Sequence, residues 1–119
     1  MSIRNRVVGR WGELKAADFL ACKGYIILGT NVRTPHGEID LVALKGEQVV
    51  FVEVKTRTSR TYGLPEDSIT PRKQSHMMAA AECYLESHPS YDEWQFDVIA
   101  VERLPHGRTD IQHFENIFG

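Results

Sequence analysis

The chain has 119 residues, 42% of them hydrophobic and 25% charged, which is typical of an ordinary globular protein, so we expect a single domain over residues 1–119. The formal net charge of −2 excludes binding of nucleic acid through an overall positive field. The start of the chain has no apolar segment of signal-peptide length and no apolar run is long enough to span a membrane, so we expect a cytoplasmic protein without a membrane partner.

The first predicted element is a helix over about residues 5–23, which Gly24 ends. Small residues on one side of this helix allow it to pack closely on a sheet. Glu13 lies one turn before two of them, Ala16 and Ala17, so it projects on the same side. Two interpretations of Glu13 stay open: an acid directed at the sheet, and a partly exposed residue at the edge of the packing face.

Residues 25–32 predict a short strand, and a turn that contains His36 leads into a hairpin over residues 37–55. The first strand of this hairpin carries Glu38 and Asp40, and the second carries Glu53 and Lys55. With a tight turn at residues 45–48, the register places Asp40 opposite Glu53 and Glu38 opposite Lys55. The second strand is apolar on both faces, which predicts a central strand covered on both sides.

Two carboxylates on one rung of a hydrophobic hairpin repel each other, so Asp40 and Glu53 require a counter-charge. A divalent cation is the obvious candidate, and carboxylate oxygens suit Mg²⁺ or Mn²⁺. Such an ion polarises a phosphoryl oxygen and lowers the pKa of a bound water. Lys55, on the same face as Glu53, is placed to orient or deprotonate that water or to stabilise charge in the transition state. These residues, with Glu13 as a third acid, predict phosphodiester hydrolysis.

The remaining elements are a loop, a helix and two strands. Residues 57–70 show no period and leave the sheet directly after Lys55, so they are either part of a site or a solvated loop. Thr70 and Pro71 begin a helix that runs to about Ser87. Residues 94–101 predict a buried strand whose only charge, Asp97, we interpret as structural, and residues 109–114 predict an edge strand. Five polar residues of the loop and the helix start are expected to contact phosphate: Arg57, Arg60, Arg72, Lys73 and Gln74.

This order of elements predicts an α/β fold, with a mixed sheet flanked by helices. The pattern of Asp40 followed by Glu53-Val54-Lys55 resembles the core of the PD-(D/E)XK nuclease superfamily, with Ile39 in place of the proline. More closely, the chain resembles the YraN family of uncharacterised bacterial proteins over about residues 8–118, through the segments GRWGELKAADFL, NVRTPHGEIDLVA, VFVEVKTR and FDVIAV.

The resemblance implies a restriction-endonuclease-like αβββαβ core and an activity similar to that of Holliday junction resolvases. By position, it implies that Glu13 is the helix acid, that Asp40 and Glu53 are the metal ligands, and that Lys55 is the motif lysine. The expected activity is therefore a Mg²⁺- or Mn²⁺-dependent endonuclease that acts on nucleic acid, with structured or branched DNA as the leading substrate. A homodimer would suit two-fold symmetric junctions.

Two other functions stay open. The first is a nucleic-acid-binding module on the same fold without catalysis, which would bind in a salt-dependent manner and need no metal. The second is a structural or protein-interaction protein, in which Glu38 pairs with Lys55 and Asp40 is only hydrogen-bonded. The fold alone does not decide among the three functions.

Overall fold

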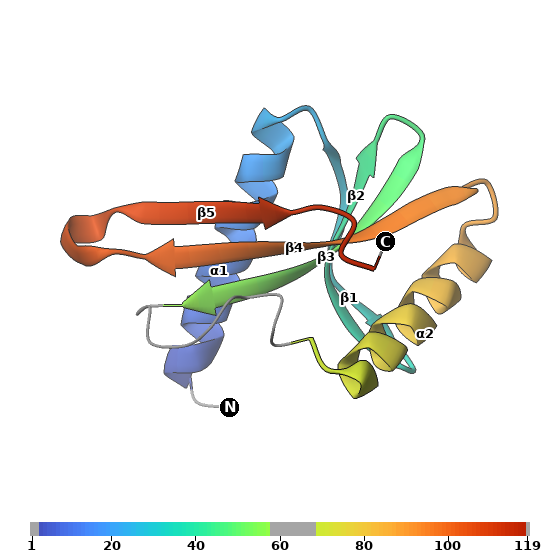
Figure 1. Ribbon diagram of the computed structural model, residues 1–119, viewed down its shortest axis with the longest axis horizontal. Helices are drawn as coiled ribbons and strands as arrows, with labels where there is room; N and C mark the ends of the chain where they lie inside the picture. Colours follow the sequence, from blue (N-terminus) through green and yellow to red (C-terminus); the bar gives the residue numbers. More distant parts are fainter. Residues whose placement is uncertain (1–2, 58–68, 119) are drawn as a thin grey trace.

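A computed structural model of the chain describes residues 3–57 and 69–118 (Figure 1). Its elements are, in chain order, α1 (Ile3–Cys22), β1 (Ile26–Thr34), β2 (Gly37–Lys45), β3 (Gln48–Arg57), α2 (Pro71–Ser87), β4 (Glu93–Arg103), the short 3₁₀ helix η2 (Pro105–Gly107) and β5 (Thr109–Phe114). The helices and strands predicted from the sequence are all present, and their ends differ from the predicted ones by no more than two residues.

The five strands form one mixed sheet in the order β1-β2-β3-β4-β5. β3 and β4 are parallel, whereas the other neighbouring pairs are antiparallel. β3 is therefore the central strand, as its two apolar faces predicted. The predicted α/β fold, a mixed sheet flanked by helices, is confirmed, and it is consistent with a restriction-endonuclease-like core.

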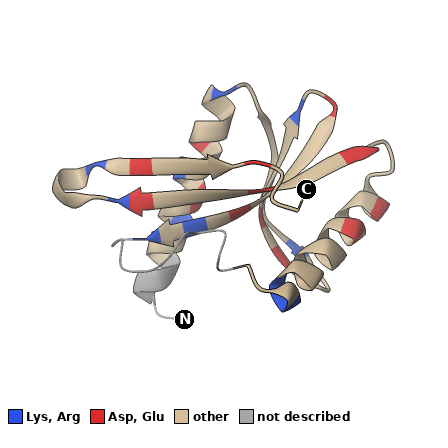
Figure 2. Cartoon of the chain, in the orientation of Figure 1, with Lys and Arg blue, Asp and Glu red and all other residues tan. Residues whose placement is uncertain are grey.

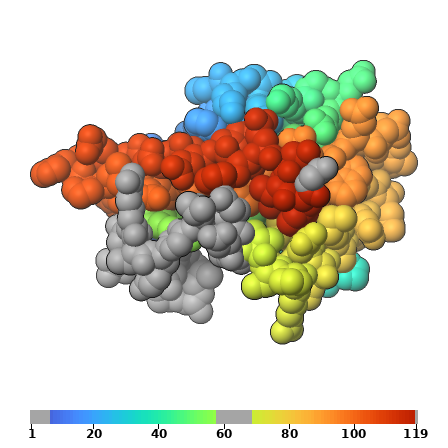
Figure 3. Space-filling view, viewed as in Figure 1, coloured from blue at the N-terminus to red at the C-terminus, as the bar shows by residue number. Residues whose placement is uncertain are grey.

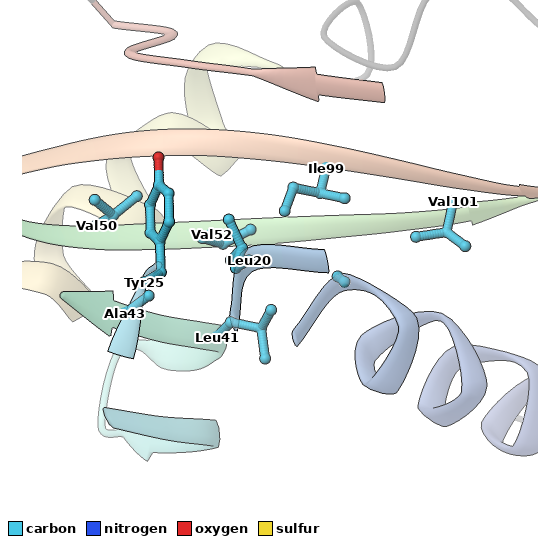
Figure 4. Packing of buried hydrophobic residues seen from close by; sticks show 9 residues of the cluster. Leu20, Tyr25, Leu41, Ala43, Val50, Val52, Ile99 and Val101 are labelled. Carbon is cyan, nitrogen blue, oxygen red and sulfur yellow. The ribbon is translucent and has the colours of Figure 1, made fainter. Parts of the chain in front are cut away.

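Each face of the sheet has its own hydrophobic core, because successive strand residues point to opposite faces. On one face, Leu20 of α1 packs in a cluster with Leu41 and Val52 (Figure 4). On the other face, Ala80 of α2 packs in a cluster with Phe51. Neighbouring residues of β3 thus belong to different cores, and each helix is held against the strands that carry the predicted site.

The ends of the two helices follow the local chemistry of the sequence. Thr70 caps α2, because its side-chain oxygen accepts the N–H of Lys73 at 3.1 Å, and Pro71 follows at the first helical position. Gly24 ends α1 with a φ of +93°, a left-handed conformation that favours glycine. α2 therefore starts at a fixed point, one turn before the residues that reach the sheet.

Asp97 is fully buried in β4 and holds the last residues of the chain in place. Its Oδ1 accepts the N–H of Asn116 at 2.9 Å, and its Oδ2 lies 2.7 Å from Nε2 of His113. Because the ammonium of Lys23 contacts Nδ1 of His113 at 2.9 Å and can only donate, Nε2 carries the proton that Asp97 accepts. These bonds agree with the structural role that the sequence predicted for Asp97.

The hairpin of β4 and β5 extends beyond the other strands and gives the molecule an elongated outline (Figures 1 and 3). Its tip is η2, where the N–H of Leu104 donates to the carbonyl oxygen of Arg108 at 2.7 Å. Neither helix, over the residues that the structure describes, combines the length and the apolar character needed to cross a membrane.

Candidate active site

The hydrogen-bonded ladder between β2 and β3 ends just before the predicted acidic pair. Its last partners are Leu41 and Val52, so Asp40 and Glu53 are the next residues along their strands. The register is the predicted one, but the backbone pairing stops at Leu41 and Val52 and does not continue to Glu38 and Lys55 as expected. At this point the N–H of Val54 donates to Oδ2 of Asp40 at 2.8 Å. A side-chain oxygen thus replaces a backbone acceptor and holds the carboxylate against β3.

The predicted contact between Glu38 and Lys55 is wrong. Within the described residues, the ion-pair partner of Glu38 is Arg33 of β1, with 3.8 Å between Oε2 and Nε. Lys55 instead lies against Glu53 of its own strand, with 3.4 Å between Nζ and Oε1. The prediction failed because it extended the ladder past its end, where β2 and β3 no longer exchange backbone hydrogen bonds.

Three carboxylates from α1 and β2 come together at the end of the ladder. Glu13, Glu38 and Asp40 each offer one oxygen, and these atoms all lie within 4.8 Å of one another. Gly12 allows α1 to come this close, since a Cβ at this position would stand 1.9 Å from Oγ1 of Thr56 in β3. Glu13 therefore reaches the acids of β2 and is also partly exposed, so each of its two interpretations describes it in part. The sequence did not lead us to count Glu38 among the metal ligands, although strand alternation places it on the face of Asp40.

Burial and neighbouring charges raise the pKa of Asp40 from its ordinary value of 3.8 to about 7. Burial is the largest cause, and the charges of Glu53 and Glu13 act in the same direction. The hydrogen bond from Val54 and the charge of Lys73 act in the opposite direction but do not outweigh them. The carboxylate is thus held where its negative charge is disfavoured, which is the condition that a bound cation would relieve.

Two lysines converge on one oxygen of Glu53. Nζ of Lys73, in the first turn of α2, lies 2.5 Å from Oε1 of Glu53, and Nζ of Lys55 lies 3.4 Å from the same atom. Burial lowers the pKa of Lys55, and its hydrogen bond with Lys73 lowers it further. Lys73 was predicted only as a phosphate contact, because no local pattern shows how the first turn of α2 lies over β3.

The other predicted phosphate contacts do not form one group with Lys73. Arg72 and Gln74 are exposed on the first turn of α2, and Gln74 lines a shallow hollow together with Met78. Arg57 is half-buried at the end of β3. Figure 2 shows basic residues at these two places, the start of α2 and the end of β3. Arg60 lies outside the described residues.

A cavity of about 230 Å³ opens beside the acids, between α2 and the strands β2 and β3. Glu38, Asp40 and Glu53 line it from the sheet, and Lys73 lines it from α2. The site therefore joins four acids, two lysines and a hollow that can take part of a ligand.

Comparison with known proteins places the chain in a family. Residues 12–101 match the model of "Uncharacterised protein family UPF0102". A UPF0102 protein of Syntrophomonas wolfei is 46% identical over 115 residues, which cover 96% of this chain and 99% of that protein. A UPF0102 protein of Symbiobacterium thermophilum is 44% identical over 115 residues, which cover 96% of this chain and 98% of that protein. The chain therefore belongs to the UPF0102 family, the YraN family that its motifs resemble.

Proposed function

We propose that the protein is a metal-dependent nuclease that hydrolyses phosphodiesters of nucleic acid, with structured or branched DNA as the expected substrate. The observation that supports this most is the meeting of Glu13, Glu38 and Asp40 beside Glu53, at the point where the ladder between β2 and β3 ends. Acids gathered at a half-buried point cost folding free energy, so a role in binding a cation explains them better than a structural role.

The residues fit Mg²⁺ or Mn²⁺. The donors that cluster here among the described residues, Glu13, Glu38 and Asp40, are carboxylates, whose oxygens are the ligands that hard divalent cations prefer. Asp40, Glu53 and Glu13 would hold the ion, as predicted, and the position of Glu38 adds it as a fourth candidate. When bound, such an ion polarises the phosphoryl oxygen and acidifies a water.

The lysines would supply the remaining chemistry. Because the pKa of Lys55 is lowered, its Nζ atom can take a proton from the attacking water at a lower pH than an ordinary lysine can. Lys73 would keep Glu53 oriented through their ion pair and add positive charge for the substrate phosphate. The hydrogen bond from Val54 would hold Asp40 in place while the phosphate binds.

The test is a cleavage assay with Mg²⁺ or Mn²⁺ on branched, flapped, single-stranded and double-stranded DNA, and on RNA. We expect cleavage by the wild-type protein, and a loss of at least ~100-fold in Asp40→Ala, since removal of even a residue that supports a metal ligand costs about 10–100-fold. Asp18→Ala is the matched control, because Asp18 is an exposed acid on α1. Absence of cleavage on every substrate, or full activity of Asp40→Ala, would reject the proposal.

A further inference from the structure

The cavity beside the acids has two chemically different parts. The carboxylates of the proposed site line it from β2 and β3, and apolar side chains line it from β2, α2 and β4. Ile39, Met77, Ala80 and Phe96 form this apolar part. A cavity that served only to admit metal and water would not need an apolar part, so a portion of the substrate is the better explanation for it.

The size of the cavity limits what it can hold. Its volume of about 230 Å³ is below the roughly 300–1,000 Å³ of pockets that enclose drug-sized ligands. It can therefore hold one flat group rather than a whole nucleotide. A phosphodiester placed at Asp40 and Glu53 would have its own base one sugar away, and a nucleobase is flat, with apolar faces and a polar edge.

We propose that this cavity binds one unstacked nucleobase, from a nucleotide next to the phosphodiester that is cleaved. The inference rests on the proposed function and narrows its substrate class. In a continuous duplex the bases are stacked inside the helix, so a base can enter a protein cavity only after it has left the stack. Single-stranded segments, flaps and branch points present such bases without the cost of unpairing.

Two histidines from different elements line the cavity. His76 comes from α2, His36 comes from the turn between β1 and β2, and both are exposed residues. Thr34 holds this turn, because its Oγ1 accepts the N–H of His36 at 3.1 Å and donates to the carbonyl oxygen of Gly37 at 2.8 Å. Imidazole rings can stack on a base or bond to its edge, as histidines do in proteins that bind single-stranded RNA.

The test fills the cavity and measures binding without cleavage. Ala80 is 2% exposed and lines the cavity, so Ala80→Leu places three further carbon atoms there. Ala79→Leu is the matched control, because Ala79 is its neighbour on α2 but lines a different hollow. His76→Ala is a second variant, whose exposed position keeps its effect on folding small. Thermal melting checks that each variant folds.

The probes are a single-stranded DNA oligonucleotide and a duplex of the same length, titrated without metal and followed by fluorescence anisotropy. We expect wild-type protein to bind the single strand more tightly. Ala80→Leu should weaken that binding at least ~10-fold, the order expected for losing one bound base. It should change duplex binding less than about twofold, since duplex binding uses phosphate contacts. His76→Ala should weaken only single-strand binding, and Ala79→Leu should match wild type. A 2-aminopurine in the single strand should become brighter on binding, except with Ala80→Leu.

The outcomes separate the two proposals. Equal affinity for both probes would overturn the base-binding cavity, and so would an unchanged single-strand affinity in folded Ala80→Leu and His76→Ala. Neither result would affect the nuclease proposal, which the cleavage assay tests separately. Failure to bind either probe, together with absence of cleavage, would overturn both.

Discussion

Asp40 is hydrogen-bonded to the backbone of β3 and also lies among the charged side chains of the candidate site. Its Oδ2 accepts the N–H of Val54, while Glu13 and Glu38 each place an oxygen within 4.8 Å of one of its carboxylate oxygens. This arrangement favours a protonated carboxyl or a bound cation, and it disfavours a bare carboxylate. A single residue therefore links the stability of the fold to the pH and, under the proposed function, to the metal concentration.

The pKa of Asp40 makes the stability of the protein depend on pH. Between its ordinary value of 3.8 and the value of about 7 in the folded chain, the folded state keeps a proton that the unfolded state has lost. The free energy of unfolding therefore falls as the pH rises through this window. Above it, the charged Asp40 destabilises the folded state by the full amount. Without metal, Asp40→Asn should stabilise the protein by roughly 1–4 kcal/mol at pH 8 and by little at pH 4, since each pKa unit is worth about 1.4 kcal/mol. Urea unfolding at both pH values measures this.

Asp18→Asn controls for the loss of one negative charge, because Asp18 is exposed on α1. Its effect should be small and should not change between the two pH values. An Asp40→Asn variant that loses stability at pH 8 would show that its charged form is the one that the fold favours.

Lys73 neutralises Glu53, whose side chain is only 14% exposed. Lys73→Ala should lower the free energy of unfolding by about 1–3 kcal/mol, because it leaves a mostly buried carboxylate with fewer cationic partners. Arg72→Ala, on the same helical turn but exposed, should change it by less than ~0.5 kcal/mol. Added Mg²⁺ should restore part of the lost stability of Lys73→Ala, because a metal ion bound by Glu53 would replace the missing positive charge. Chemical denaturation with and without Mg²⁺ measures both effects, and equal stabilities of the two variants would contradict the role of Lys73.

At the scale of elements, the position of α1 over β3 depends on a close contact at Gly12. A Cβ there would stand 1.9 Å from Oγ1 and 2.9 Å from Cβ of Thr56. Gly12→Ala should therefore destabilise the protein by about 1–3 kcal/mol through overpacking, although alanine favours helix by about 1 kcal/mol over glycine. It should also reduce cleavage, because Glu13 is the next residue.

Gly9 provides the matched control on the same helix. A Cβ at Gly9 would meet no atom within 4 Å in the described structure, so Gly9→Ala should stabilise the protein by up to about 1 kcal/mol. Thermal and urea unfolding of the two variants measure the difference. Equal effects of the two substitutions would show that α1 can move away from β3 without cost.

Most elements could be predicted because their signals are local. The alternation along β3, the cap at Thr70 and the stop at Gly24 each act within a few residues. The small residues on one side of α1 also predicted that this helix approaches the sheet closely, and the contact occurs at Gly12. The end of the ladder, before Leu41 on β2 and after Val52 on β3, could not be predicted, since a strand pattern says which residues face each other and not where pairing stops.

At the scale of the whole molecule, the site lies where both helices meet the centre of the sheet. α1 brings Glu13 and α2 brings Lys73 to residues of β2 and β3. The contact between Lys73 and Glu53 and the cavity beneath α2 depend on how that helix packs on the sheet, so no sequence pattern predicted them. α1 and the strands thus supply the acids of the site, and α2 supplies the ammonium of Lys73 and covers the cavity.

Binding of a divalent cation should stabilise the folded protein, because the acid cluster exists only in the folded state. At a concentration of 100 times the dissociation constant, a ligand adds about 2.7 kcal/mol, which corresponds to a rise in melting temperature of roughly 10 °C or more for a small domain. We expect a saturable rise with Mg²⁺ or Mn²⁺ at pH 8 and a smaller one at pH 5, where the proton on Asp40 competes with the metal. Asp40→Asn should lose most of the rise and Asp18→Asn should keep it, with KCl at matched ionic strength as the control for screening. An equal rise in Asp40→Asn would place the ion elsewhere and reject Asp40 as a ligand.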